Sequence, residues 1–338
     1  MPNSNPVSSN VKIGDHSVMF EGSERYAKTP VAAKSVVTGN PDPDRPKESL
    51  ASRRESKPVV RYAPLVYLHP EEEFFPATCE FFINNSELIW RHDSGCPSCR
   101  IAKKGEVDAA MLGSGGYKHR TRTSPFHWRP CAHTGDEYTS KQPTGPGRGI
   151  VGGEGFYLEL DDSSRAGQGI TSSVYYDYKQ QRYIIYWFFY CNNKKSLDRH
   201  EGDWENITVR LNGKNEATEV AYNAHGAPKI YKWGEINHYG GTHPIVYSAK
   251  GSHASYPKEG TYPTLVSGVQ DSAKKGKIWR TWAHLRYVRH MPWFGYGGSW
   301  GHVGKLLIGR SLPGPLGEAA RMTTGPTGPS LKKPPPGW

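Results

Sequence analysis

Residues 200–205, His-Glu-Gly-Asp-Trp-Glu, are the densest group of side chains that could bind a metal or carry a proton. They follow the apolar run 183–190 and open the next expected strand. Alternate residues of a strand point to the same face, so Asp203 and Glu205 are expected to present two carboxylates together, with His200 folding over them. This set suits a hard divalent cation, Ca²⁺ or Mg²⁺ rather than Zn²⁺, with water completing the shell.

The alternative is that His200, Asp203 and Glu205 form an ion pair or a structural clasp at a solvated strand end. Two carboxylates at this spacing repel each other unless a cation or an arginine lies between them. The preceding run is so apolar that the carboxylates are expected at the edge of a core. We therefore favour the cation site.

Two histidines are candidates for proton transfer. His253 lies in Gly-Ser-His-Ala-Ser-Tyr, where small neighbours allow close approach of the backbone. It could be a metal ligand, a general base or a contact to a bound molecule, or it could cap a turn through hydrogen bonds. His225, in Ala-His-Gly, has the same alternatives.

Aromatic residues and glycines alternate between residues 293 and 301. Trp293, Tyr296 and Trp300 are candidates for ligand binding, because tyrosine and tryptophan favour bilayer interfaces and sugar rings. The alternative, with equal weight, is a glycine-rich crossing packed beneath a tryptophan.

The chain has five cysteines, an odd number that argues against a fully paired disulfide framework. Cys96 and Cys99 flank Pro-Ser, and together with Cys131 and His133 they could form a zinc site. A disulfide and plain thiols are the alternatives, because no second Cys-x-x-Cys is present.

The net charge of +11 fits a polyanionic partner such as a lipid headgroup or an acidic glycan. The alternative, with equal weight, is a basic protein with no specific anionic partner. Nucleic acid is disfavoured, because no zinc-finger, basic-zipper or ribonucleoprotein motif is present. No apolar run approaches the ~20 residues of a membrane-spanning helix. The start of the sequence lacks the pattern of a standard secretory signal, so we expect a cytoplasmic or peripheral membrane protein, or export by another route.

The expected architecture is mainly β: a single β-sandwich with long loops and a few short helices. A polar, disordered arm is expected over residues 1–57, the sandwich over 58–311, and a Gly/Pro-rich tail over 312–338. The run 183–190 predicts a central strand buried on both faces, with 204–211 as its neighbour. Other predictions are a hairpin turn at 179–181, a short helix over 79–84, a loop-rich region over 91–150 and a strand at 303–308.

Several separated motifs occur in order: an aromatic strand at 186–190, residues 200–205, residues 251–256 and Gly-Gly-Ser-Trp-Gly at 297–301. In this order they resemble the vacuolar-protein-sorting-associated sixty-two family, over about residues 59–330. The name of that family implies a role in vacuolar sorting and specifies no chemistry.

Residues 200–205 are also similar to a motif of the necrosis-inducing NPP-type cytolysins. Those proteins are β-sandwiches that hold a divalent cation and bind sphingolipid headgroups. The resemblance implies that His200, Asp203 and Glu205 are cation ligands. It places Asn192 or Asn193 near the position of a further, acidic ligand, a role that Asp198 could also take. Gly202 replaces a second histidine of the motif.

Three functions remain open. The first is divalent-cation-dependent binding of a membrane lipid or glycan headgroup, by a cytolysin-like or membrane-trafficking protein. The second is metal-dependent hydrolysis of a phosphodiester or a glycan, with His253 or His225 as base. The third is a non-enzymatic interaction module in which His200, Asp203 and Glu205 only connect a loop to the sandwich. The sequence leaves the oligomeric state open.

Overall fold

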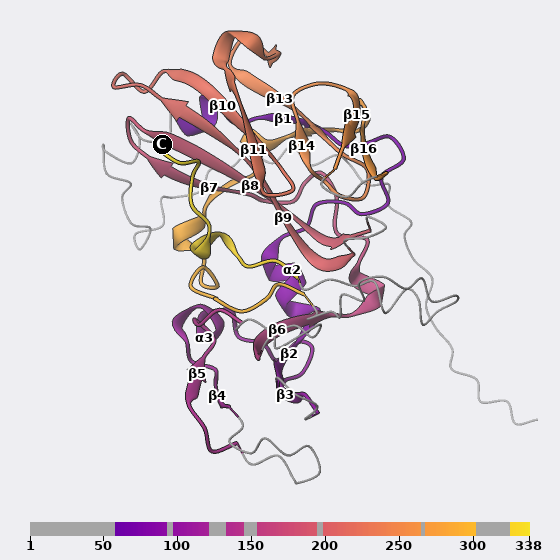
Figure 1. Ribbon diagram of the computed structural model, residues 1–338, viewed down its shortest axis with the longest axis vertical. Helices are drawn as coiled ribbons and strands as arrows, with labels where there is room; N and C mark the ends of the chain where they lie inside the picture. Colours follow the sequence, from indigo (N-terminus) through magenta and orange to yellow (C-terminus); the bar gives the residue numbers. More distant parts are fainter. Residues whose placement is uncertain are drawn as a thin grey trace, which may run out of the picture. The chain divides into compact units, whose positions relative to one another are not determined.

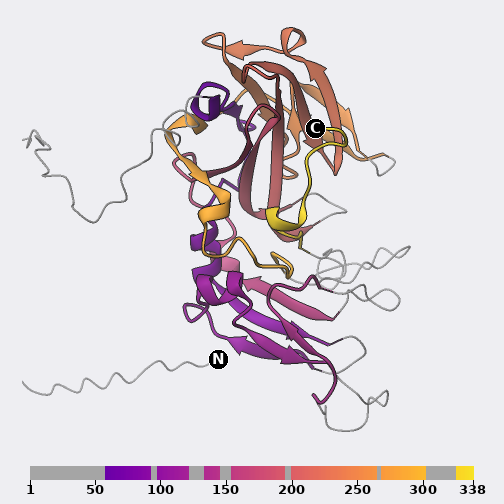
Figure 2. The same cartoon turned by 90° about the vertical axis from the view of Figure 1, so that its left-hand side faces the viewer.

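The computed structural model describes residues 58–92, 97–121, 133–144, 154–194, 199–264, 268–301 and 325–338 (Figures 1 and 2). All of them belong to one compact unit, residues 48–338. Strands predominate and the helices are short, which confirms the mainly-β prediction. No helix among these residues is long and apolar enough to cross a membrane. The arm 1–57 and the strand expected at 303–308 lie outside the described residues.

A six-stranded sheet occupies the centre, in the order β11-β10-β9-β8-β7-β18. All neighbours are antiparallel except β18 and β7. The strands are β7 (Val174–Lys179), β8 (Tyr183–Asn193), β9 (His200–Leu211), β10 (Ala217–Ala224), β11 (Ala227–Lys232) and β18 (Leu285–Tyr287). The predicted turn joins β7 to β8 through Gln181, which has a φ of 57°.

One face of this sheet packs against a second, five-stranded sheet. Its strands are β1 (Leu65–Tyr67), β12 (His238–Tyr239), β13 (His243–Ser248), β14 (Ser255–Tyr256) and β17 (Ile278–Arg280). Strand β1 lies between β13, to which it is parallel, and β17, to which it is antiparallel. Tyr186, Phe188 and Ile207 of the central sheet pack against Val66 and Trp279, so the two sheets form a sandwich.

On the other face of the central sheet lies α2 (Cys79–Asn84). Beyond α2 follows a three-stranded sheet of β3 (Cys99–Ala102), β2 (Ser86–Arg91) and β6 (Gly155–Leu160) (Figures 1 and 2). Phe189 packs there against Phe82 and Trp300, and Trp204 packs against Trp300; Phe156 belongs to the same core. Apolar layers on both sides explain why residues 183–190 have no polar alternation, and the prediction of a central, doubly buried strand is confirmed.

The helix predicted over residues 79–84 is confirmed as α2. Thr78 is its N-cap, and the Thr78 side chain accepts a hydrogen bond from the Phe81 amide. The region expected to be loop-rich contains, in its described parts, β3 and three further short elements. These are α3 (Ala109–Ser114), β4 (Lys118–Arg120) and β5 (Glu137–Thr139).

A two-stranded sheet and five 3₁₀ segments complete the described elements. The strands are β15 (Gly260–Pro263) and β16 (Gln270–Ala273). The 3₁₀ segments are η1 (Asp162–Ser164), η2 (Trp233–Glu235), η3 (Thr281–Ala283), η4 (Val288–His290) and η5 (Pro329–Leu331).

Residues 325–338 lie against the same side of the central sheet as α2. The Trp300 amide donates to the Pro326 carbonyl at 2.8 Å. Farther along, Arg182 donates to the Trp338 carbonyl at 2.8 Å, and the Arg210 guanidinium lies 5.7 Å from the centre of the Trp338 ring. This segment therefore follows the sheet as far as the β7–β8 turn.

Candidate functional site

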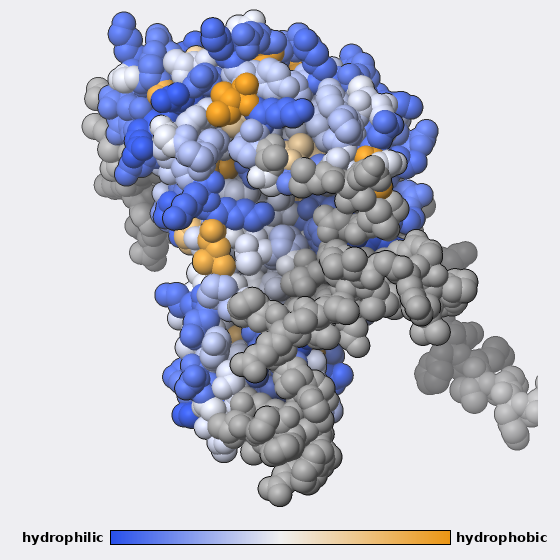
Figure 3. All heavy atoms as spheres, viewed as in Figure 1, coloured by the Kyte–Doolittle hydropathy of each residue, from blue (hydrophilic) through white to orange (hydrophobic). Residues whose placement is uncertain are grey.

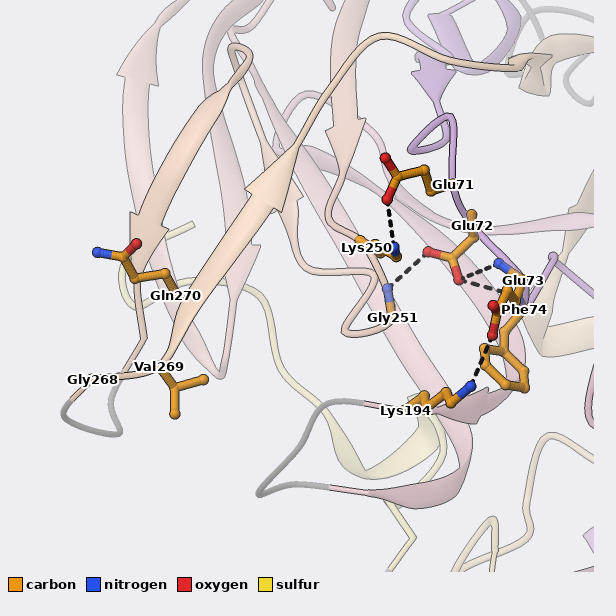
Figure 4. Close-up of a pocket in the computed structure, with 10 residues that line it drawn as sticks. All are labelled: Glu71, Glu72, Glu73, Phe74, Lys194, Lys250, Gly251, Gly268, Val269 and Gln270. Carbon is orange, nitrogen blue, oxygen red and sulfur yellow. Dashed lines mark hydrogen bonds and ion pairs between the residues drawn. The ribbon is translucent and has the colours of Figure 1, made fainter.

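A cavity of about 510 Å³ opens where the segment after β1 meets the turn after β13 and the start of β16 (Figure 4). Its lining combines carboxylates, ammonium groups, an amide and an aromatic ring. The lining residues are Glu71, Glu72, Glu73, Phe74, Lys194, Lys250, Gly251, Gly268, Val269 and Gln270. A cavity of this size and polarity fits a small polar molecule.

Two ion pairs stand at the rim of the cavity (Figure 4). The Lys250 ammonium lies 2.6 Å from Glu71, and the Lys194 ammonium lies 2.8 Å from Glu73. Lys194 also lies 5.4 Å from the centre of the Phe74 ring. Exposed pairs of this kind contribute little to stability, so these side chains are free to exchange partners with a bound molecule.

Glu72 is the buried acid of the cavity. Its Oε2 accepts from the Gly251 amide at 2.8 Å, and its Oε1 accepts from the amides of Glu73 and Phe74 at 3.0 and 3.1 Å. Burial alone would raise the pKa of Glu72, but the His253 imidazolium and these backbone donors lower it to about 2. Glu72 is therefore a carboxylate at all physiological pH values.

His253 lies behind Glu72 and is fully buried. Its Nδ1 lies 2.8 Å from Asp203 Oδ2, while its Nε2 donates to the Phe74 carbonyl at 3.2 Å and lies 3.7 Å from Glu72 Oε1. Burial by itself would lower the pKa of His253, but Asp203 and Glu72 raise it to about 10. The imidazolium is stacked on Tyr190, with ring centroids 3.8 Å apart. His253 is thus a buried cation between two carboxylates.

The backbone explains how His253 reaches this position. His253 has a φ of 54° and Gly251 a φ of 72°, both in the left-handed region. The His253 amide donates to the Ala249 carbonyl at 2.9 Å, which closes the turn between β13 and β14. A left-handed histidine costs free energy, and such strain is typical of sites where function fixes the conformation.

Asp203 and Glu205 lie opposite Tyr190 and Phe188 in the β8–β9 register, and therefore on the same face, as the alternation predicted. Glu205 Oε2 is buried and has no hydrogen-bond partner. Burial and the charge of Asp203 raise the pKa of Glu205 well above its usual range. The positive charges of Lys332 and His253 act on Glu205 in the opposite direction.

His200 does not join the two carboxylates. Within the ranges that the structure covers, only one group of His, Cys, Asp or Glu brings three ligand atoms within 4.8 Å of one another, and it is elsewhere. The His200 Nδ1 lies 2.7 Å from the Gly202 carbonyl. Gly202 has a φ of 60°, and a Cβ there would lie 2.0 Å from the Trp300 carbonyl oxygen. This conformation interrupts the side-chain alternation between His200 and Asp203, and His200 does not fold over the two carboxylates as expected.

Neighbouring residues of β8 and β9 also differ from the predicted ligand set. Glu201 accepts from the Leu160 amide at 3.0 Å and pairs with Arg165 at 2.8 Å, on the side of β6. Asn192, the further ligand implied by the cytolysin resemblance, lies opposite Glu201 and is buried. Asp203 and Glu205 are therefore the two predicted ligands that the fold places together.

His225 is held by Asp271. Its Nε2 lies 2.7 Å from Asp271 Oδ2, and this fully buried carboxylate also accepts from Ser252 and Tyr256, each at 2.8 Å. His225 has a φ of 53°. These contacts fit a histidine that fixes the β10–β11 turn.

The prediction that Trp293, Tyr296 and Trp300 contact a ligand is wrong. Their exposed fractions are 0%, 1% and 0%, and all three belong to the core on the α2 side of the central sheet. The glycines between them allow close packing: a Cβ at Gly297 would lie 2.0 Å from the Lys141 carbonyl oxygen. The alternative of a packed crossing was correct. Figure 3 shows only scattered apolar residues on the face that it presents.

Of the four residues proposed for zinc or a disulfide, Cys96 and Cys131 lie outside the described residues. Cys99 carries a free thiol, and its Sγ lies 3.8 Å from His133 Nε2.

Glu72 was not among the predicted site residues. Its signal in the sequence is the run of three glutamates at 71–73, which follows the apolar run 65–68 and a His-Pro pair and precedes two phenylalanines. Nothing local indicates that this run meets His253.

The comparisons with known proteins agree with the first resemblance. The protein-family model for vacuolar protein sorting-associated protein 62 matches residues 190–301, which include Asp203, Glu205 and His253. Vacuolar protein sorting-associated protein 62 of Saccharomyces cerevisiae is 22% identical over 281 residues, which cover 73% of this chain. The match spans 57% of the length of that relative.

Solved structures that resemble the chain include proteins of the second group. Necrosis and Ethylene inducing Protein 2, from the causal agent of cocoa's witches' broom disease, has 16% identity and a TM-score of 0.29, with 69% of this chain and 74% of that chain covered. NLPPya in complex with glucosamine has 14% identity and a TM-score of 0.33, with 73% and 78% covered. Because these TM-scores are low, function has to be argued from the residues of this chain.

Proposed function

We propose that this chain binds the polar headgroup of a glycan or a glycolipid in the cavity above Glu72, without chemical turnover. The observation that carries the proposal is the lining, in which carboxylates, ammonium groups and an amide surround a space of about 510 Å³ beside an aromatic ring. Sugar hydroxyls donate to carboxylates and accept from ammonium groups, and the C–H face of a sugar ring packs on an aromatic ring.

The charge of the lining favours a neutral or amino-bearing sugar over a phosphate. Glu71 and Glu73 each have a lysine partner, whereas Glu72 is balanced from inside by His253. The chain as a whole is basic, with a net charge of +11. Long-range attraction would bring it to an anionic membrane surface. In the cavity itself, three glutamates against two lysines in the lining would favour a headgroup that carries no negative charge.

Binding is better supported than hydrolysis. Both ring nitrogens of His253 already donate, to Asp203 and to the Phe74 carbonyl, so the imidazolium has no lone pair to accept a proton. Glu72, with a pKa of about 2, has no proton to donate at neutral pH. His225 faces Asp271 rather than the lining of the cavity.

A divalent cation is the second part of the proposal. Glu205 has a buried oxygen without a partner, beside a second carboxylate on the same face. Ca²⁺ or Mg²⁺ would add to the positive charge of His253 and Lys332 near this pair, held by Asp203 and Glu205 with water in the remaining positions. The cation would then stabilise the part of β9 that contacts His253, and through His253 the position of Glu72.

A role in membrane trafficking is a compatible cellular setting. It rests on the family match over residues 190–301, which covers the buried charges behind the cavity. The sorting function suggested by the name of the relative is thus a proposal for this chain.

Calorimetric titration tests the headgroup proposal. The probes are glucosamine, glucose and glucose 6-phosphate, followed by phosphatidylcholine vesicles with and without glucosylceramide. We expect glucosamine to bind most tightly and the phosphate to bind least. The double variant Glu71→Gln/Glu73→Gln should weaken binding at least tenfold without changing the melting temperature, because both side chains are exposed. Glu216→Gln, on the distant β9–β10 turn, is the matched control.

The absence of binding to every sugar and vesicle would refute the headgroup proposal. The cation part has its own readout, the melting temperature with Ca²⁺ or Mg²⁺ against a chelator. We expect the cation to raise the melting temperature of the wild type and not of Glu205→Gln. An equal rise in both proteins would place the cation elsewhere.

A further inference from the structure

Three histidines and a cysteine converge in a part of the molecule that the proposed function does not use. His92 follows β2, Cys99 begins β3, His119 lies in β4, and His133 precedes β5. Each offers one ligand atom, and the four atoms lie within 4.8 Å of one another. We propose that these residues bind a structural Zn²⁺ ion.

The distances agree with a shared metal. In a tetrahedral site, Zn–S bonds of about 2.3 Å and Zn–N bonds of about 2.05 Å place sulfur and nitrogen about 3.6 Å apart. The Cys99 Sγ lies 3.4 Å from His92 Nε2 and 3.8 Å from His133 Nε2, on either side of that value. Simple packing of a thiol against an imidazole would not by itself place two histidine nitrogens around one sulfur at these distances.

In two of the three histidines, the ring nitrogen that would not bind zinc already has a hydrogen-bond partner, as is usual in zinc sites. The His92 Nδ1 lies 3.0 Å from the Glu154 carboxylate, and the His119 Nδ1 lies 2.8 Å from the Arg120 carbonyl. The Arg120 carbonyl only accepts, so the His119 Nδ1 carries the hydrogen and its Nε2 keeps the lone pair. The His92 Nδ1 also lies 3.2 Å from the Trp90 indole nitrogen, a donor, but the Glu154 carboxylate is closer and favours the hydrogen on Nδ1. Carboxylates and carbonyls hold metal-binding histidines in this tautomer in many zinc sites.

The three histidine rings pack closely together, which brings their possible ligand nitrogens near one another. The ring centroids of His92, His119 and His133 lie 4.6 to 5.3 Å from one another. His119 is also stacked on Trp90, with centroids 4.9 Å apart. The side chain of His92 is fully buried, and the other three ligands are partly buried.

Nitrogen and sulfur ligands favour zinc over calcium or magnesium, and four protein ligands leave no position for a substrate. The role we infer is therefore structural. The hairpin β4–β5 has strands of only three residues, and hairpins of that size are marginal in water. Zinc would join this hairpin to the β3-β2-β6 sheet and so fix the region that was expected to be loop-rich.

Elemental analysis of the full-length protein, purified under reducing conditions without added metal, tests the proposal. We expect about one zinc per chain in the wild type, and less than about a tenth of that in Cys99→Ser and His119→Ala. His290→Ala, which changes an exposed histidine, is the matched control and should keep the metal. Full zinc content in both ligand variants would overturn the proposal.

Cobalt substitution gives a readout that does not depend on variants that fold. Wild-type protein, stripped with a chelator and loaded with Co²⁺, should show the intense visible bands of tetrahedral cobalt and a thiolate-to-cobalt charge-transfer band. Added Zn²⁺ should remove both. A cobalt spectrum without the thiolate band, or a disulfide at Cys99 in protein isolated without reductant, would overturn the assignment.

Discussion

Replacing His253 by glutamine should destabilise the chain strongly. Glutamine keeps hydrogen-bonding groups near Asp203 and Glu72 but removes the positive charge between them. Breaking a buried ion pair by removing one partner costs about 3–5 kcal/mol, because the remaining charge stays buried without compensation. Two carboxylates lose their partner here, so we expect a value in the upper part of that range.

The pKa of His253 gives the same order of magnitude and a pH dependence. Its pKa is about 10 in the folded chain against an ordinary value of 6.5. Because the folded-state pKa is raised, the stabilisation is complete below pH 6.5 and is lost as the pH rises from 6.5 to 10. At about 1.4 kcal/mol per pKa unit, the full effect is of the order of 5 kcal/mol.

Urea unfolding of wild type and His253→Gln at pH 6 and pH 9.5 measures both effects. The wild type should lose several kcal/mol between these pH values, and the variant should lose much less over this interval. At about 2–4 °C per kcal/mol, the variant should melt about 6–20 °C lower at pH 6. His290→Gln, at an exposed position, is the control. A variant within 1 kcal/mol of the wild type at pH 6, with an unchanged pH dependence, would refute the reasoning.

Three further predictions concern stability. Gly202→Ala should cost at least about 2 kcal/mol in a thermal melt, because its φ is 60° and its Cβ would meet the Trp300 carbonyl, whereas Gly234→Ala, with open space around it, should be near neutral. Thr78→Ala should cost about 1 kcal/mol by urea unfolding, because it removes the N-cap of α2; a change below 0.3 kcal/mol would count against the cap. In acid titration, Glu72 should hold its stabilisation above pH 4.5 and lose it as the pH falls towards 2, because its folded-state pKa is lowered to about 2; Glu72→Gln should lack this loss.

The central strand and its neighbour could be predicted from the sequence because the types of consecutive residues indicate which faces of these strands are buried. An apolar run without alternation indicates two covered faces, and β8 has both. The common face of Asp203 and Glu205 followed from the same period of two. His200 was expected to fold over these carboxylates from a preceding turn, but it lies in β9 before Gly202, whose left-handed conformation breaks the alternation.

The remaining site depends on contacts between distant segments, which residue spacing does not specify. Glu72 meets His253 only because β1 pairs with β13. Trp300 resembled an exposed binding residue because glycines surround it, but glycines serve close packing as well as exposed loops. For the proposed zinc site, Cys99 and His133 stood out in the sequence, whereas His92 and His119 had no neighbouring signal.

The position of β1 has a consequence for the order of folding. Leu65 pairs with Ile245 on one side and with Arg280 on the other, so an early segment is completed by two late ones. Contacts so distant along the chain form slowly, because a long loop has to close first. During synthesis, the glutamates after β1 leave the ribosome long before the segment that carries His253. Glu72 therefore lacks its buried counter-ion, His253, until most of the chain has been made.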